Sequence, residues 1–373
     1  MIKMLLKKPI QNGIFVLLMI LLLLANIWSG FFSKLLYLSP NIMSTDKTQI
    51  HFISVGQGDA IAIKFASGET MLIDSGTELY RSKLIRYLNN VVLDSKKIDY
   101  VVLTHPDLDH SGNMEYIVSN YDIGTFYRPP IYLESEVEEG EKYSTNKTYA
   151  NIIKTLKSRG ILIEISSKPK SINIGKSRVS WIYPDKDDLI HDDDDASNIY
   201  SAVMLLEDNG KKALFTGDIS ENVERLLLNN YDESVLDVDI LKIAHHGSSG
   251  STSSNFLEAT SPDYAFISVG ENTYGHPANA MLDRIIEYDS THGTSLYKNI
   301  YRTDKLGNII CSFDDNVIIE NIDNIDKYSF TPFWVYTVLA TASLLVFMLL
   351  PYIKLKYKDW VYEKRNKNYR NKT

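Results

Sequence analysis

The 373-residue chain has a single cysteine, Cys311. One thiol cannot form an intrachain disulfide, and it cannot supply the several thiolates of a cysteine-based zinc site. The chain also lacks low-complexity tracts and internal repeats, which argues for a globular protein. No G-x-S-x-G turn surrounds the serine-rich run 248–254, and no EF-hand spacing accompanies the acidic run 192–195. These absences leave imidazole and carboxylate groups as the candidates for chemistry.

Long uncharged runs occur only near the two ends. Residues 13–32 and 331–353 are 20 and 23 residues without charge, each long enough to cross a hydrocarbon layer of about 30 Å. A cleaved signal peptide is the alternative for the first run, but its length and the missing cleavage site favour an anchor. The tails 1–12 and 354–373 are basic, so the positive-inside rule predicts that both are cytoplasmic. We therefore expect a two-pass protein of a bacterial cell membrane, with a folded extracytoplasmic domain over 45–328.

The segment between the two runs has little positive charge. The whole chain has 39 Lys and Arg against 47 Asp and Glu. Three basic residues precede the first run, and eight basic and two acidic residues follow the start of the second. The middle therefore holds 28 basic against 45 acidic residues, a net charge of −17. This balance disfavours passive binding of long polyanions, which normally relies on a basic surface.

Polar groups follow strand-like runs at several points of the middle segment. Helices are expected near 82–89, 149–159 and 221–228, and a hairpin is expected across Asn209-Gly210. The polar groups after strand-like runs are Asp74, the cluster 105–110, Asp218, His245-His246 and His276. Strand ends that share one edge of a sheet can bring such groups together in space.

The stretch VVLTHPDLDHSGN, 101–113, is the densest of these groups. A spacing of two can place His105, Asp107 and Asp109 on one side of an extended loop, while His110 diverges from its neighbour. Such a layout suits two metal ions, because imidazole and carboxylate ligands bind Zn, Mn or Fe. Two cations can activate water near neutral pH, and a carboxylate such as Asp218 can bridge them. A solvated turn is the alternative for the loop taken alone.

The motif THPDLDHSGN resembles the HxHxDH signature of the metallo-β-lactamase superfamily, with aspartate at the second histidine. Together with VGQGDA, LIDSG, LFTGD, LKIAHHGS and SVGENTYGHP, its order resembles the hydrolase domain of ComEC-type DNA-uptake proteins. The resemblance runs from about His51 to Cys311. It implies an α/β fold, the αββα sandwich, with a binuclear metal site at one sheet edge.

The resemblance also implies ligands for each metal. His105 and Asp107 would hold one metal, Asp109 and His110 would hold the other, and Asp218 would bridge them.

One member of the pair His245-His246 would complete the ligand set, and which one stays open. His276 would be a further ligand or the proton donor to the leaving oxygen. Asp74 would orient the ligand loop from outside the ligand set.

The chain departs from the superfamily pattern at two points. Many members carry another histidine before the bridging aspartate, where this chain offers Asn198 and Ser201. His191 lies in the acidic loop and is expected to be solvated. A site with fewer imidazole ligands and more oxygen ligands is chemically harder, which favours manganese over zinc. ComEC-type proteins also carry a channel of many helices, which two membrane runs cannot form, so a separate channel partner is implied.

These features predict a membrane-anchored binuclear metal hydrolase that cleaves phosphodiesters, with nucleic acid as the substrate that the resemblance suggests. Asp109 and His276 are its expected catalytic residues, and two Mn or Zn ions are its expected cofactors. A phosphoesterase acting on cell-envelope phosphoesters is the alternative enzyme, since a fold does not fix a substrate. An inactive surface receptor or assembly protein is the alternative of another class.

Overall fold

The computed structural model describes residues 47–136, 146–168, 170–185, 197–313 and 316–321, with Lys356, Tyr357, Trp360 and Val361. Residues Thr45–Asp323 form one compact unit. Both uncharged runs, 13–32 and 331–353, and His191 lie outside the described residues. Among the described residues, no helix combines the length and apolar character needed to span a bilayer.

The first sheet has eight strands among the described residues, in the order β15-β14-β1-β2-β3-β4-β5-β6. Neighbours from β15 to β3 are antiparallel, and β3 to β6 run parallel. The strands are β1 (Gln49–Phe52), β2 (Ile61–Lys64), β3 (Thr70–Ile73), β4 (Lys97–Val102), β5 (Asp122–Arg128), β6 (Leu162–Ile165), β14 (Ile309–Phe313) and β15 (Val317–Asn321).

The second sheet has seven strands among those residues, in the order β13-β12-β11-β10-β9-β8-β7. Neighbours from β7 to β10 are antiparallel, and β10 to β13 run parallel. The strands are β7 (Lys170–Ile174), β8 (Ser177–Tyr183), β9 (Val203–Asp208), β10 (Lys211–Phe215), β11 (Ile240–Lys242), β12 (Tyr264–Ile267) and β13 (Ile300–Arg302).

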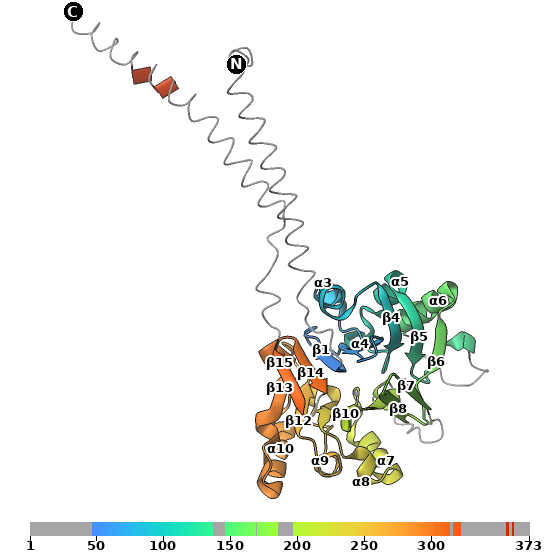
Figure 1. Ribbon diagram of the computed structural model, residues 1–373, viewed down its shortest axis with the longest axis vertical. Coiled ribbons are helices and arrows are strands. Elements are labelled where there is room, and N and C mark those ends of the chain that lie inside the picture. The colour runs from blue at the N-terminus through green and yellow to red at the C-terminus, as the bar shows by residue number, and fades with distance from the viewer. Residues whose placement is uncertain are drawn as a thin grey trace, which may run out of the picture. The chain divides into compact units, whose positions relative to one another are not determined.

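Helices connect the parallel strands, because a parallel crossover needs an intervening element. In Figure 1, α3, α5 and α6 lie beside β4 and β5, and α7 to α10 lie with the second sheet. The helices of the first half are η1 (Glu78–Tyr80), α3 (Arg81–Tyr87), η2 (Leu88–Val92), α4 (Leu108–Ser111), α5 (Met114–Asn120), η3 (Glu134–Glu136) and α6 (Lys147–Arg159). Those of the second half are η4 (Asn198–Tyr200), α7 (Glu221–Asn230), α8 (Glu233–Leu236), η5 (Ala244–Gly247), α9 (Ser254–Thr260), α10 (Asn279–His292), η6 (Leu296–Asn299) and α11 (Thr303–Leu306).

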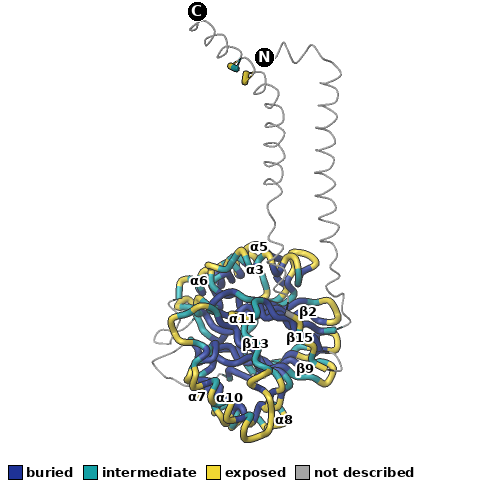
Figure 2. The backbone as a smooth tube through the Cα atoms, turned by 90° about the vertical axis from the view of Figure 1, so that its left-hand side faces the viewer, coloured by how far each residue is buried: buried dark blue, intermediate teal, exposed yellow. Residues whose placement is uncertain are grey.

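The core lies in layers. One apolar cluster joins the facing sides of the two sheets, where Phe52 of β1 stacks on Phe266 of β12 with ring centroids 4.2 Å apart. A second cluster joins the second sheet to α7, α9 and α10. Figure 2 shows the strands mainly as buried tube, with exposed residues on the helices and turns. Burying a phenylalanine contributes about 2 kcal/mol, so the sheet–sheet interface is a major source of stability. This is the αββα sandwich expected from the sequence.

Local sequence explains the clearest elements. In α6 the buried Tyr149, Ile152, Ile153 and Leu156 recur on one helical face. The side chain of Asn146 accepts a hydrogen bond from the backbone N–H of Tyr149 and caps the start of this helix.

The other expected elements are also present. The hairpin between β9 and β10 turns at Asn209-Gly210, and both residues have positive φ, as a type I′ turn requires. The helices expected near 82–89, 149–159 and 221–228 correspond to α3 with η2, α6 and α7.

Candidate metal centre

The ligand loop follows β4 and differs from the extended form expected for it. His105 lies after the strand, and Asp109 and His110 lie on the helical turn α4. The backbone N–H of Ser111 donates to the carbonyl of Asp107 at 2.7 Å, which closes that turn. Neighbouring side chains on a helix diverge by about 100° rather than 180°, so Asp109 and His110 can reach one point. The extended geometry was therefore wrong for this part of the loop.

Four side chains from three strand ends meet at that point. Ligand atoms of Asp109, His110, Asp218 and His246 all lie within 4.8 Å of one another. The Oδ2 atom of Asp218 lies 3.2 Å from the Nε2 atoms of both His110 and His246. Asp218 follows β10, and His246 follows β11, so the parallel strand ends of the second sheet bring them to the loop after β4.

The partners of the Nδ1 atoms orient both histidines. Nδ1 of His110 lies 2.7 Å from Oδ2 of Asp74, and Nδ1 of His246 lies 2.8 Å from the carbonyl oxygen of Ser268. A carbonyl oxygen only accepts, so Nδ1 of His246 carries a proton and, in the neutral ring, Nε2 carries the lone pair. Asp74 also accepts from the N–H and hydroxyl of Thr104 at 2.8 and 2.7 Å. Asp74 therefore links Thr104 to His110.

His105 and Asp107 lie beside this cluster. The rings of His105 and His110 have centroids 4.0 Å apart, and Nε2 of His105 is 3.8 Å from Oδ2 of Asp107. The hydroxyl of Ser201 lies 3.2 Å from Nδ1 of His105 and accepts a hydrogen bond from the backbone N–H of Asp218 at 3.2 Å. Ser201 therefore joins the ligand loop to the strand end that carries Asp218.

Asn198 has a different place from Ser201. It is buried in η4, and its carbonyl accepts from the backbone N–H of Ser201 at 3.0 Å. Asn198 thereby helps to place Ser201 through the backbone.

The donor set fits divalent metal ions. The Nε2 atom of His105 is buried and makes no hydrogen bond among the described residues. Buried polar atoms are normally paired, and leaving them unpaired costs free energy. Imidazole nitrogens and carboxylate oxygens directed at one point are the ligands that Zn, Mn and Fe take.

The histidine pair is divided by burial. His246 is buried and belongs to the four-residue cluster, whereas the side chain of His245 is 29% exposed with its Nε2 3.9 Å from Oδ2 of Asp218. Both have positive φ, 49° and 54°. This backbone is unfavourable for residues with a Cβ and is held by the surrounding structure. His276 completes the rim, with its ring 5.6 Å from that of His245 and 6.5 Å from that of His246.

Two residues at the centre were not identified from the sequence: Asp59 and Lys242. Lys242 is the last residue of β11 and is fully buried, and its ammonium pairs with the carboxylate of Asp59. The same ammonium donates to the carbonyl of Gly217 at 3.0 Å and lies 3.6 Å from Oδ1 of Asp218. Asp218 therefore has one oxygen on the histidine side and the other on the lysine side. Both residues lie in motifs already singled out, VGQGDA and LKIAHHGS. For Lys242 the available signal was a charged residue inside an apolar strand, whereas Asp59 lies in the turn before β2.

The VGQGDA turn packs directly on the ligand loop. The backbone N–H of Asp59 donates to the carbonyl of Asp109 at 3.1 Å. A Cβ on Gly58 would lie 2.3 Å from that same carbonyl oxygen, and the φ of Gly58 is 144°. Glycine is therefore required here by both contact and backbone conformation.

Without metal, protons balance the carboxylates. Burial lowers the pKa of His246, but Asp218 and Asp109 outweigh it and raise that pKa to about 10. Burial also opposes the shift of His110, whose pKa is raised well above its usual value by Asp218 and Asp74. Burial would raise the pKa of Asp218, yet His110 and His246 hold it well below the usual range. Metal ions would have to displace these protons, because only the neutral imidazole is a ligand.

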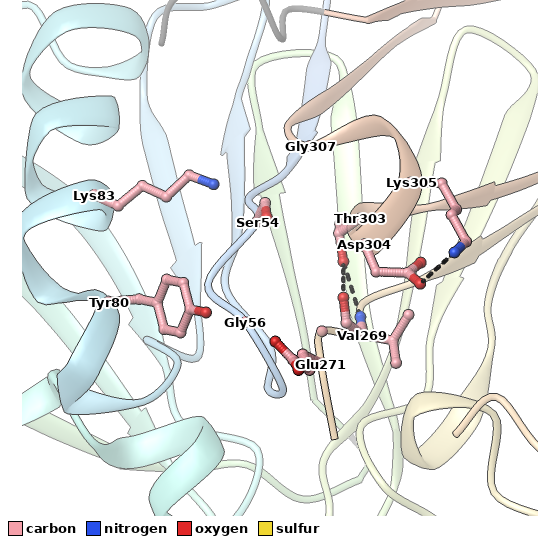
Figure 3. A pocket seen from close by; sticks show the side chains of 11 residues that line it. Ser54, Gly56, Tyr80, Lys83, Val269, Glu271, Thr303, Asp304, Lys305 and Gly307 are labelled. Carbon is pink, nitrogen blue, oxygen red and sulfur yellow. Dashed lines mark hydrogen bonds and ion pairs between the residues drawn. The ribbon is translucent and has the colours of Figure 1, made fainter. Parts of the chain in front are cut away.

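A cavity of about 310 Å³ lies near the turn that carries Asp59. Figure 3 shows Tyr80 and Lys83 on one wall and Asp304 and Lys305 on the opposite one. The ammonium of Lys305 lies 3.6 Å from Oδ2 of Asp304. Since the wall bears both signs of charge, it does not specify an anion or a cation.

This chain is similar to several known proteins. The family model described as "Metallo-beta-lactamase superfamily" matches residues 53–271. "ComE operon protein 3" of Bacillus subtilis is 24% identical over 301 residues, which cover 76% of this chain and 35% of that protein. "Competence protein ComA" of Neisseria gonorrhoeae is 26% identical over 261 residues, covering 69% and 32%. The metallo-beta-lactamase fold protein YhfI of Bacillus subtilis is 13% identical, with a TM-score of 0.44, covering 72% of this chain and all of that one.

The chain spans about a third of the length of these curated relatives. The family match covers more than half of the present chain and includes the ligand loop and both His245 and His246. It confirms the fold and the class of metal-dependent hydrolase that the motifs predicted. The chain belongs to the metallo-β-lactamase superfamily, and its curated relatives are competence proteins of the ComEC type.

Proposed function

We propose that this protein is a membrane-anchored phosphodiesterase that uses two divalent metal ions and acts on nucleic acid. The observation that carries the proposal is the meeting of Asp109, His110, Asp218 and His246 within 4.8 Å, with the ring of His105 beside that of His110 at a centroid distance of 4.0 Å. Imidazole and carboxylate groups at this density are what hydrolytic metal centres use.

The two metals would share Asp218. His110, His246 and Asp109 would hold one ion, and His105 with Asp107 would hold the other. The ligands include three carboxylates, which favours manganese over zinc. When bound, such ions supply Lewis acidity and neutralise the charge that develops on phosphorus oxygens.

The chain's own residues would position the ester and move the proton. Asp74 and the carbonyl of Ser268 hold His110 and His246 with Nε2 toward the centre. His276 stands at the rim, half-buried, within reach of a group bound there. We assign His276 the delivery of a proton to the leaving oxygen, and Asp109 the anchoring of the metal nearest to that oxygen.

The relatives suggest the setting. One of them is named a competence protein, and a nucleic acid substrate at the cell surface fits that context. The runs 13–32 and 331–353 would anchor the domain outside a bacterial membrane, beside a separate channel protein. The net charge of −17 between the runs favours a second candidate, a small phosphoester of the cell envelope, because it opposes binding of long DNA.

The test uses the full chain purified in detergent, with single-stranded DNA and bis(p-nitrophenyl) phosphate as substrates and Mn or Zn added. We expect both to be cleaved, and we expect Asp109→Ala to lower the rate more than about 100-fold, since even outer partners of a metal site contribute 10- to 100-fold. Asp94→Ala is the matched control, because this carboxylate is 88% exposed and pairs only with Lys64 among the described residues. Cleavage of the small ester alone would move the substrate to envelope phosphoesters. Equal rates for Asp109→Ala and the wild type would refute the metal site.

A further inference from the structure

The loop between β12 and α10 presents an exposed aromatic ring beside the candidate centre. Tyr274 is 76% exposed, and its ring stacks on that of His276 with centroids 5.7 Å apart and planes 28° apart. One face of the tyrosine ring therefore meets the histidine. The chain has 24 tyrosines, and nothing in the sequence alone distinguishes this one.

Asn272 fixes the loop from within. Its Nδ2 donates to the carbonyls of Gly270 and His276, each at 2.9 Å. Its Oδ1 accepts from the backbone N–H groups of Tyr274 at 3.0 Å and His276 at 3.1 Å. Single exposed apolar residues are common on proteins and need no function. A ring on a loop held by four hydrogen bonds and stacked on a catalytic candidate is a different case.

The stacking partner of Tyr274, His276, also lies near the candidate metal centre. The ring of His276 lies 6.5 Å from that of His246, which belongs to the metal cluster. A group attached to a phosphate at the cluster would thus extend past His276 toward Tyr274. The segment 272–277 holds no Asp, Glu, Lys or Arg, although Glu271 precedes it in the same loop.

We propose that Tyr274 is a substrate-binding subsite, against which stacks the nucleobase of the nucleotide whose phosphate lies at the metal centre. This inference rests on the proposed function and specifies its substrate as a nucleotide strand rather than an aliphatic phosphoester. Stacking on an aromatic side chain accepts every base, because each base has a π-face. The subsite would therefore supply affinity without sequence preference.

The test measures binding without turnover. Isothermal titration of the metal-loaded full chain compares thymidine 5′-monophosphate with 2-deoxyribose 5-phosphate, which has the same phosphate and sugar but no base. We expect the nucleotide to bind about 5- to 150-fold more tightly, the range that corresponds to 1–3 kcal/mol per stacked base. Tyr274→Ala should bring the two affinities together, while Tyr274→Phe should preserve the difference. Tyr297→Ala, at a 46% exposed tyrosine on η6, is the matched control and should behave as the wild type.

Each result of the titration either supports or overturns the proposed subsite at Tyr274. Equal affinities in the wild type, no binding of either ligand, or an undiminished preference in Tyr274→Ala would overturn the subsite. Failure of the proposed function is separate, because it shows as absent hydrolysis of both esters. Hydrolysis of both with equal affinities in the titration would leave the phosphodiesterase standing and remove only the stacking role of Tyr274.

Discussion

Replacing Lys242 by methionine is expected to destabilise the metal-free protein by about 3 kcal/mol. Breaking a buried ion pair by removing one partner typically costs about 3–5 kcal/mol, because a buried charge is left unpaired. The side chains of Lys242 and Asp59 are 1% and 2% exposed, so water cannot solvate the remaining carboxylate. The substitution also removes the donor to Gly217, at 3.0 Å. His246, with Nδ1 3.7 Å from Oδ1 of Asp59, compensates part of the charge and places the cost at the lower end of the range.

Urea denaturation with EDTA, followed by fluorescence of the buried Trp181, measures this cost. The double variant with Asp59→Asn should recover most of the loss, since neither charge then remains unpaired. Lys64→Met is the control, because its partner Asp94 is 88% exposed and such pairs contribute about 0–1 kcal/mol. A loss for Lys242→Met no larger than that for Lys64→Met would refute the reasoning.

Three further predictions concern the ligand loop, its protons and a peripheral ion pair. Gly58→Ala should weaken metal binding at least about tenfold in a metal titration, because its Cβ would meet the carbonyl of Asp109 at 2.3 Å; unchanged affinity would show that the loop tolerates the shift. The pKa of His246 is raised to about 10, so a metal ion must displace its proton at lower pH. Between pH 6.5 and 10, the metal dissociation constant should fall about tenfold for each unit by which the pH rises and for each proton displaced. Titration in buffers of different ionisation enthalpy counts those protons, and a pH-independent constant would contradict the assignment. Burial alone would raise the pKa of Glu136, but hydrogen bonds, including that from Arg128, lower it to about 2. The ionised carboxylate therefore stabilises the fold above its unfolded pKa, and this contribution is lost as the pH falls from about 4.5 to 2. Glu136→Gln should cost about 1–2 kcal/mol at pH 7 and flatten the acid limb of a pH-dependent denaturation series, whereas an unaltered limb would exclude this pair as its cause.

The fold could be predicted because its strands end in recognisable polar groups. The apolar run before His105 becomes β4 of the first sheet, and the run before Asp218 becomes β10 of the second sheet. Their carboxyl ends meet between the two sheets rather than along the edge of one sheet. The type I′ turn at Asn209-Gly210 follows from local sequence alone. The extended form of the ligand loop was wrong, since hydrogen bonds within 107–112 close a helical turn that alternation of polar residues does not reveal.

Which histidine of the pair joins the cluster depends on backbone conformation, and sequence does not encode that directly. Both His245 and His246 have positive φ, and only His246 finds a carbonyl acceptor for Nδ1, at Ser268. Asp59 and Lys242 were missed for a related reason. Lys242 is an isolated charge in an apolar strand, and Asp59 lies in a glycine-containing turn. They are distant in the chain, so their burial becomes visible only when the two sheets are brought together.

Charge at the centre explains how an acidic domain could accept an anionic ester. Among the described residues, the cluster and its immediate neighbours hold five carboxylates, those of Asp59, Asp74, Asp107, Asp109 and Asp218. Lys242 supplies one positive charge, which leaves four negative charges when the histidines are neutral. Two divalent cations would cancel these, whereas one would leave two negative charges facing the phosphodiester. Because like charges in a poorly solvated site repel strongly, the lysine makes the proposed pair of metals sufficient for binding an anion. Without Lys242 the same two ions would leave the centre negative, so under the proposed function the buried lysine would contribute to binding the anionic ester as well as to stability.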